Sequence, residues 1–383
     1  MPPSIYLDCN ATTPIDPEVV EAMSAVLRAG YANPASPHHA GRRARRVLEA
    51  AREAILSLLG GKTTGMQADK LIFTSGGTEA NNLALFGLTA EATGPVIVSP
   101  LEHPSIQRAA ELLQSRGREV RRLRALPDGR VDVSRLSDDI PTGAALVAVM
   151  AANNETGVVQ PLPSLAERCR AANVTLFTDA VQAVGKIPVD FRGWDVAALS
   201  VTAHKFHGPV GIGALVLRAD MKLEPQLVGG FQQAALRPGT ESVALAVGFQ
   251  AALEKALREL ETRTTRMAVL RDELQRRIQA GDPQAYVVGA ESPRTPHTLN
   301  IAFRGLDRQP LLLALDLAGV ACSTGSACAS GSSEPSPTLV AMGLPEDVVR
   351  GSLRFSLGAF TTADEVATAA ERILAAVRAA RAR

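Results

Sequence analysis

Apolar residues recur at helical spacing in two stretches near the start of the chain. Residues 17–29 have one apolar face, and Asp16 and Pro17 form a typical helix start. Between residues 42 and 59 apolar side chains again recur every three or four positions, until a pair of glycines ends the pattern. The pattern predicts two helices, separated at residues 30–41 by a loop whose Gly, Asn and Pro disfavour regular structure.

From residue 71 onward, short apolar runs alternate with segments of helical periodicity. The predicted strands are residues 71–74, 96–99, 145–150, 174–178, 196–201 and 213–217, and the predicted helices span 78–88, 163–172 and a segment from Pro104. This order is typical of an α/β domain with a mostly parallel sheet. Ligands bind at the carboxyl ends of the strands in such sheets, so polar residues that directly follow these strands are candidates for a functional site.

The last part of the chain alternates differently. A long helical region over residues 243–279, with an interruption expected near 262–265, leads to a strand at 298–303, a helix at 309–317, a further helix, a strand at 352–356 and a final helix from Thr362. This order indicates a smaller α+β unit. We therefore predict a large α/β domain over residues 15–260 and a small α+β domain formed by residues 1–14 together with 261–383.

Composition excludes several classes of protein. Hydrophobic residues make up 46% and charged residues 21% of the chain, as in soluble globular proteins. The net charge of +1 gives no electrostatic reason to expect nucleic acid or an acidic membrane as partner. The chain shows neither a signal peptide nor an apolar run of membrane-spanning length, and its four cysteines lack disulfide-framework or zinc-type spacing. We expect a reduced, cytoplasmic protein that binds no metal.

Lys205 lies just after the predicted strand 196–201, in the sequence Ala203-His-Lys-Phe-His-Gly-Pro-Val210. A lysine in this place can be an ordinary surface cation, as most lysines are. It can also form a Schiff base with an aldehyde cofactor. The spacing alone leaves both interpretations open.

A second candidate segment, Ser75-Gly-Gly-Thr78, joins the strand 71–74 to the next helix. Its two glycines let the backbone approach a ligand closely, and the free N–H groups and positive dipole end of the helix suit a phosphate. The alternative is a capped helix start with Thr78 as the N-cap. As a phosphate site this segment would complement a Schiff-base lysine.

Two further polar residues follow predicted strands. Asp179, after strand 174–178, can keep a pyridine nitrogen protonated, with Gln182 in reach of a ring oxygen; the alternative is an Asp that caps the next turn. His103, after strand 96–99, can stack on a ring or exchange protons, although a lone His is more often structural. Both residue types fit a pyridine cofactor.

Cys328 lies in Gly325-Ser-Ala-Cys-Ala-Ser-Gly331, a segment of small residues that predicts a mobile surface loop at about 322–335. Free cysteines are usually buried, so a thiol in such a loop is a candidate nucleophile. The other cysteines, Cys9, Cys169 and Cys322, are interpreted as packing residues.

Arg354 lies between Leu353 and Phe355 in a predicted strand. A buried guanidinium needs an anion. That anion is either a carboxylate of the fold or the carboxylate of a substrate.

Together these segments resemble the cysteine desulfurases of the NifS/IscS type, in the class V aminotransferase group of fold-type I pyridoxal-phosphate enzymes. The resemblance extends over nearly the whole chain, and its most specific motifs are Asn33-Pro-Ala-Ser36, Thr74-Ser-Gly-Gly-Thr-Glu79, Asn153-Asn-Glu155, Thr178-Asp-Ala-Val-Gln182, Ala203-His-Lys205 and Gly325-Ser-Ala-Cys-Ala-Ser-Gly331. It implies pyridoxal 5'-phosphate as cofactor, a homodimer, and conversion of L-cysteine to L-alanine. The sulfur passes to an acceptor protein, a scaffold or a carrier, as in iron–sulfur cluster biosynthesis.

The resemblance also implies the role of each site residue. Those assigned to the cofactor are Gly77, Thr78, His103, Asn154, Asp179, Gln182, Thr202, His204, Lys205 and Thr240. Lys205 forms the Schiff base and moves the substrate's Cα proton, while Thr240 reaches the cofactor phosphate of the partner subunit. Asn33, Asn154 and Arg354 bind the substrate. Cys328 attacks the substrate sulfur and becomes a persulfide.

Two segments depart from the family pattern. Gln233 and Ala234 stand where relatives carry a charged pair, and His207-Gly-Pro-Val210 replaces a Tyr-Gly-Pro-Lys-like run. Both segments are expected near the mouth of the cofactor site. Two alternatives therefore stay open: a related lyase that acts on selenocysteine or another β-substituted amino acid, and a catalytically weak partner in sulfur trafficking or regulation.

Overall fold

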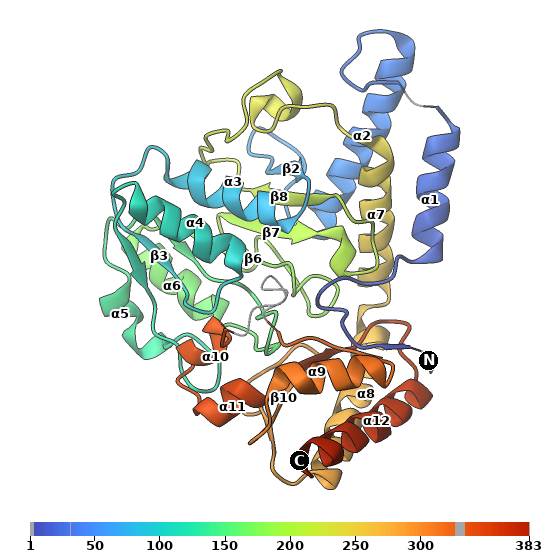
Figure 1. The fold of residues 1–383 in the computed structure, drawn as a ribbon. Coiled ribbons are helices and arrows are strands. Elements are labelled where there is room, and N and C mark those ends of the chain that lie inside the picture. The colour runs from blue at the N-terminus through green and yellow to red at the C-terminus, as the bar shows by residue number, and fades with distance from the viewer. Residues whose placement is uncertain (1–3, 31, 326–333, 383) are drawn as a thin grey trace.

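The computed structural model describes residues 4–30, 32–325 and 334–382, and its centre is a seven-stranded sheet (Figure 1). The strand order is β2-β8-β7-β6-β5-β3-β4. The strands are β2 (Lys70–Thr74), β3 (Val96–Val98), β4 (Val120–Arg122), β5 (Leu146–Ala148), β6 (Leu176–Asp179), β7 (Ala198–Thr202) and β8 (Gly213–Leu217). β8 runs antiparallel to the other six strands of this sheet, which are parallel to one another, so the predicted mostly parallel sheet is confirmed.

Helices cover both faces of this sheet, and alternate strand residues point to opposite faces. Val96 and Val98 pack with α3 (Gly77–Thr89) and α4 (Pro104–Ser115), whereas Ile97 belongs to the core on the other face. That second core contains residues of α1 (Pro17–Arg28), α2 (His39–Leu58), α5 (Leu136–Asp139), α6 (Leu162–Ala172) and α7 (Val243–Arg258). Burial on both faces explains why the strands read as continuous apolar runs.

A smaller antiparallel sheet, in the order β12-β10-β9, forms the lower part of the molecule in Figure 1. Its strands are β9 (Ala285–Val287), β10 (Thr298–Phe303) and β12 (Ser352–Ser356). The helices around it are α8 (Leu260–Gly281), α9 (Arg308–Leu317), α10 (Pro337–Ala341), α11 (Glu346–Gly351) and α12 (Ala363–Arg381). The start of the chain joins this part, because β1 (Ile5–Tyr6) pairs with β11 (Val320–Ala321) and Leu7 is in the same core.

Two local predictions were wrong. The break in the long helical region lies at Glu259 rather than at residues 262–265, and the Arg263 side chain pairs with Glu259 one turn away inside α8. Threonine is only slightly unfavourable in a helix. The Arg263–Glu259 pair and tertiary packing therefore keep residues 262–265 helical. Likewise Thr78 is not an N-cap, because α3 begins at Gly77 and its N-cap is Gly76.

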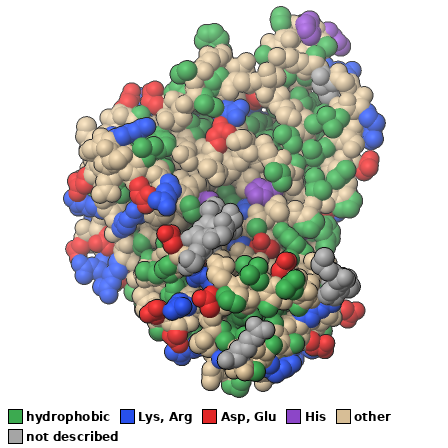
Figure 2. All heavy atoms as spheres, in the orientation of Figure 1, with side chains coloured by type: hydrophobic (Ala, Val, Ile, Leu, Met, Phe, Trp, Pro, Cys, Tyr) green, Lys and Arg blue, Asp and Glu red, His purple; other side chains and the backbone are tan. Residues whose placement is uncertain are grey.

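The face of the molecule drawn in Figure 2 is electrostatically mixed. On the face in Figure 2, Lys and Arg side chains alternate with Asp and Glu. Within residues 4–30, 32–325 and 334–382, every helix is too short or too polar to cross a bilayer.

Candidate active site

Polar side chains that follow several strands of the large sheet meet at one cavity of about 230 Å³. The residues that line it are Gly77, Thr78, Asn81, His103, Ser105, Met150, Asn154, Asp179, Val181, Gln182, Thr202, His204 and Lys205. All residues assigned to the cofactor except Thr240 are among them. They meet because the carboxyl ends of parallel strands share one edge of a sheet.

The start of α3 forms one wall of this cavity. Its N-cap, Gly76, offers no side chain to the first N–H groups of the helix. A Cβ atom on Gly77 would lie only 3.0 Å from a methyl carbon of Val181, so a larger residue would crowd the wall. Uncapped N–H groups at the positive end of a 13-residue helix favour an anion such as phosphate.

Thr202 and His204 stand beside this helix start, at the end of β7. The Thr202 hydroxyl donates to the backbone oxygen of Ile212 over 3.0 Å. The His204 ring shares a hydrogen bond with the Thr12 hydroxyl at 3.1 Å. Burial, and secondarily the charge of Lys205, lower the pKa of His204 to about 4. Its imidazole is therefore neutral at physiological pH.

Asp179 ends β6 and is held rigidly by two donors. Asn81 Nδ2 donates to Asp179 Oδ2 over 2.7 Å, and the backbone N–H of Val181 donates to Oδ1 over 2.9 Å. Asn81 is itself fixed, because the Ser200 hydroxyl donates to its side-chain oxygen over 2.5 Å. Sequence reasoning missed Asn81 and Ser200. The signal for Asn81 was a polar residue one turn after Gly77, just before the helix continues as the apolar run Leu83-Ala-Leu-Phe-Gly-Leu88.

His103 precedes α4 and accepts from the first turn of that helix. Its Nδ1 accepts the backbone N–H of Ser105 over 3.1 Å, which places the proton of the neutral ring on Nε2. Burial lowers the pKa of His103; the Asp179 carboxylate opposes this shift and the Lys205 charge adds to it. A half-buried, neutral imidazole that lines the cavity is suited to accept and return a proton.

Lys205 ends a short 3₁₀ turn, η2 (Ala203–Lys205), and is oriented by the beginning of the chain. Its Nζ donates to the backbone oxygens of Asn10 and Ala11 over 2.6 and 2.7 Å. The Gln182 amide donates to the same Asn10 oxygen over 3.1 Å. Residues 10 and 11 therefore belong to the site, although sequence reasoning did not assign them a role.

Arg354 is 1% exposed and lies outside the set of residues that line the cavity. Its guanidinium pairs with Asp8 at 2.6 Å and donates to the backbone oxygens of Asn154 and Gly325 over 3.0 and 3.3 Å. The Nε atom is buried without a hydrogen-bond partner among the described residues. The ion pair with Asp8 is the structural alternative that the sequence left open, and substrate binding by Arg354 stays a prediction.

Cys328 lies outside the described residues, but the residues on both sides of its segment are anchored next to Asn154. The Ser336 hydroxyl donates to Glu155 Oε2 over 2.6 Å. Gly325, at φ +90°, passes so close to Glu155 that a Cβ atom there would lie 2.9 Å from the same oxygen. Burial raises the pKa of Glu155, which the Ser336 and Thr338 hydroxyls oppose. Sequence reasoning did not single out Glu155.

The structure does not bring Asn33 or Thr240 to this cavity. Asn33 is exposed, and its side-chain oxygen accepts the N–H of Ala35 over 2.9 Å. Thr240 is exposed at the end of the segment 229–240. Their assigned roles therefore stay predictions.

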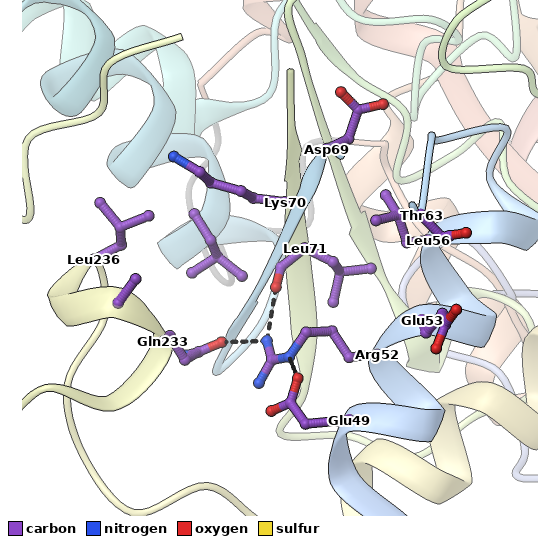
Figure 3. A pocket seen from close by; sticks show the side chains of 12 residues that line it. Glu49, Arg52, Glu53, Leu56, Thr63, Asp69, Lys70, Leu71, Gln233 and Leu236 are labelled. Atoms are coloured by element: carbon purple, nitrogen blue, oxygen red, sulfur yellow. Dashed lines mark hydrogen bonds and ion pairs between the residues drawn. The ribbon is translucent and has the colours of Figure 1, made fainter. Parts of the chain in front are cut away.

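The segment that carries Gln233 lines a different and larger cavity, of about 500 Å³, at the edge of the sheet (Figure 3). The Gln233 amide accepts from the N–H of Phe73 over 2.7 Å and donates to its carbonyl over 2.9 Å, as a neighbouring strand would. Figure 3 shows Arg52 between Gln233, Leu71 and Glu49. Gln233 and Ala234 therefore do not line the cavity that contains Lys205, and their expected place near the mouth of a cofactor site stays a prediction.

His207 is also absent from the cavity lining. It is 3% exposed, its Nε2 accepts the N–H of Ala359 over 3.2 Å, and its ring packs edge-on against Phe360. The side chain thus connects the two parts of the molecule. Its expected place at the cofactor mouth was wrong, because the ring packs against the turn after β12 and so lies away from the cavity.

Comparisons with known proteins identify the family of the chain. The model of the family "Aminotransferase class-V" matches residues 5–368. The cysteine desulfurase IscS of Dictyoglomus turgidum is 39% identical over 94% of this chain and 91% of its own length. The cysteine desulfurase NifS of Azotobacter vinelandii is 39% identical over 94% and 90%. The crystal structure of a NifS-like protein from Rickettsia africae superposes with a TM-score of 0.87 at 27% identity, covering 96% of this chain and 98% of that one.

Proposed function

The chain belongs to the class-V aminotransferase family, and from this premise we propose that it is a pyridoxal-phosphate-dependent cysteine desulfurase. It converts L-cysteine to L-alanine and transfers the sulfur to Cys328. The observation that carries the proposal is the single cavity that brings together Lys205, Asp179, His103 and the uncapped start of α3. The curated relatives with 39–41% identity are cysteine desulfurases.

The residues of the cavity fit pyridoxal phosphate. The start of α3, with Thr78, would hold the phosphate, and the Asp179 carboxylate would pair with the pyridine nitrogen. Lys205 would hold the aldehyde carbon, since its amine lines the same cavity. When bound, the cofactor supplies an electron sink for the substrate's Cα.

The chain's own residues perform the remaining tasks. Lys205 moves the Cα proton, and the neutral His103 ring accepts and returns a proton. The Cys328 thiolate attacks the substrate sulfur, so that an S–S bond forms as the substrate's C–S bond breaks. The electron pair of that bond stays on the carbon, which takes up a proton and yields alanine. A thiol reductant or an acceptor protein then removes the sulfur from Cys328.

A cytoplasmic homodimer is part of the same proposal. Thr240 faces solvent rather than its own cavity, and on the preceding residues of the chain Val228 is 96% and Phe231 is 93% exposed. A second copy of the chain would cover these apolar side chains and bring Thr240 to its cofactor. The described cysteines, Cys9, Cys169 and Cys322, are free thiols, which fits a reducing compartment.

The proposal is tested by product analysis of the reconstituted protein. With L-cysteine and dithiothreitol, we expect alanine and sulfide in equal amounts. Pyruvate in place of alanine would instead identify a β-elimination lyase, and a higher rate with L-selenocysteine than with L-cysteine would identify a selenium-specific enzyme. Tight cofactor binding without turnover of either amino acid, or of cystine, would favour the trafficking or regulatory alternative.

Arg354→Ala is expected to raise KM for cysteine and lower kcat/KM roughly 30- to 160-fold. This corresponds to about 2–3 kcal/mol for the loss of a charge-assisted pair with the substrate carboxylate. Steady-state kinetics measure the effect. The matched control is Asp8→Asn, which removes the ion-pair partner but keeps the guanidinium. An equal loss in both variants would leave Arg354 with a structural role only.

A further inference from the structure

Lys186 is a buried cation next to the candidate active site, and none of the steps described above uses it. It lies in the turn that follows β6 and Asp179, the same turn that carries Gln182 to the cavity. Its side chain does not line the cavity. Instead its Nζ donates a 2.7 Å hydrogen bond to the backbone oxygen of Lys205. Lys186 is 4% exposed, so this contact is shielded from water.

The close approach of this turn to Lys205 depends on Gly185. The glycine has a φ of +73°, and a Cβ atom on it would lie 2.9 Å from the Cβ of Phe206, the residue after Lys205. A side chain at residue 185 would therefore push the turn away from Lys205. The backbone of the turn therefore determines how close Lys186 lies to Lys205.

The surroundings of Lys186 contain no compensating charge among the described residues. No carboxylate in that part of the chain forms an ion pair with it. The titratable groups that interact electrostatically with Lys186 are Cys9, Lys205, Arg263, His207 and His297. Burial raises the pKa of Cys9 to about 12 and lowers that of His207 to about 4, so both are neutral. Asp16, which also faces His207, pairs with Lys255 and Arg263.

Burying an ammonium group without a counter-ion lowers the stability of the folded state. A buried lysine of this kind therefore calls for a functional explanation. Burial lowers the pKa of Lys186 to about 8; Arg263 and Lys205 add to this shift and Cys9 opposes it. The amine is therefore still mostly protonated at neutral pH. The repulsion between two like charges is reciprocal. A charge on Lys205 disfavours the protonated form of Lys186, and a charge on Lys186 disfavours the protonated form of Lys205 to the same extent.

We propose that Lys186 is a positioning residue for Lys205, with two effects. Its hydrogen bond fixes the main chain at Lys205, and its positive charge favours the neutral form of the Lys205 amine. Only a neutral amine attacks an aldehyde, and a nearby cation is an established way to obtain one from lysine. The inference rests on the proposed function, since it assumes that Lys205 reacts with the cofactor.

The test uses apoprotein and the rate at which it becomes coloured on mixing with pyridoxal phosphate, measured at pH values from roughly 6 to 10. The variant is Lys186→Gln, because a glutamine can still donate to the Lys205 carbonyl but carries no charge. The control is Lys222→Gln, the same change at a side chain that is 87% exposed. Borohydride reduction and peptide mass analysis show whether the colour arises at Lys205.

We expect Lys186→Gln to reach half of its maximal rate at a pH about one unit higher than the wild type, while Lys222→Gln is unchanged. An unchanged midpoint in Lys186→Gln would overturn the inference alone. A wild type that forms no adduct at Lys205 would instead overturn the proposed function.

Lys186→Met gives the same comparison if Lys186→Gln does not fold, because an unbranched apolar chain of similar length suits a buried site. Circular dichroism of each apoprotein measures folding. If neither variant folds, Lys186 has a structural role and the inference is contradicted.

Discussion

Lys205→Ala should fold, bind pyridoxal phosphate without covalent attachment, and form no measurable alanine from L-cysteine. The variant keeps the backbone oxygen to which Lys186 donates and the backbone bond from Phe206 to Ala203, so η2 keeps its shape. It loses the only amine that lines the cavity in the described chain. Loss of proton transfer alone costs roughly 10²–10⁴ in rate, and loss of covalent attachment adds to it.

The measurements are the absorbance of the bound cofactor, its release on gel filtration, and alanine production. Lys222→Ala serves as the control, because this lysine is 87% exposed and pairs only with Glu91 at 3.6 Å. If Lys205→Ala retained a borohydride-reducible bond to the cofactor, another lysine would be the attachment site. A wild type that stays colourless after reconstitution would sink the cofactor assignment itself.

Cys328→Ser is expected to separate cofactor chemistry from sulfur transfer. The variant should keep the wild-type colour and its spectral response to L-cysteine, because Cys328 has no assigned part in holding the cofactor. Sulfide release should fall roughly 10³-fold or more, since a hydroxyl cannot form a persulfide. Sulfide is measured together with mass spectrometry of the protein after one turnover, in which the wild type gains one sulfur atom.

Cys322→Ser is the matched control for this prediction, as it makes the same change six positions earlier in the chain. Burial raises the pKa of Cys322 to about 12, so its thiol is not a nucleophile at neutral pH and sulfide release should continue. Sulfide release by Cys328→Ser at the wild-type rate would remove Cys328 from the mechanism. Loss of sulfide in both variants would point to a structural effect on the shared segment.

Much of the fold could be predicted because its signals are local. Apart from β4, the strands from β2 to β8 and most of the helices were found within one to three residues, since each is a short apolar run or a helical repeat bounded by Gly, Pro or Asn. The short strands β4 and β9 were missed. Their outward residues Arg121, Arg122 and Tyr286 are exposed, so they carry too little apolar pattern to stand out.

The sequence by itself determined the elements, the residues at the ends of the strands and, through parallel strand geometry, the meeting of Asp179, His103 and Lys205 at one edge. Only the tertiary structure decided what surrounds them. Lys205 is oriented by Asn10, 195 positions away, and Arg354 pairs with Asp8, 346 positions away. It also placed Lys186 beneath Lys205 and Gln233 at the edge of β2. Such contacts depend on how distant segments pack, and no periodicity in a single segment encodes them.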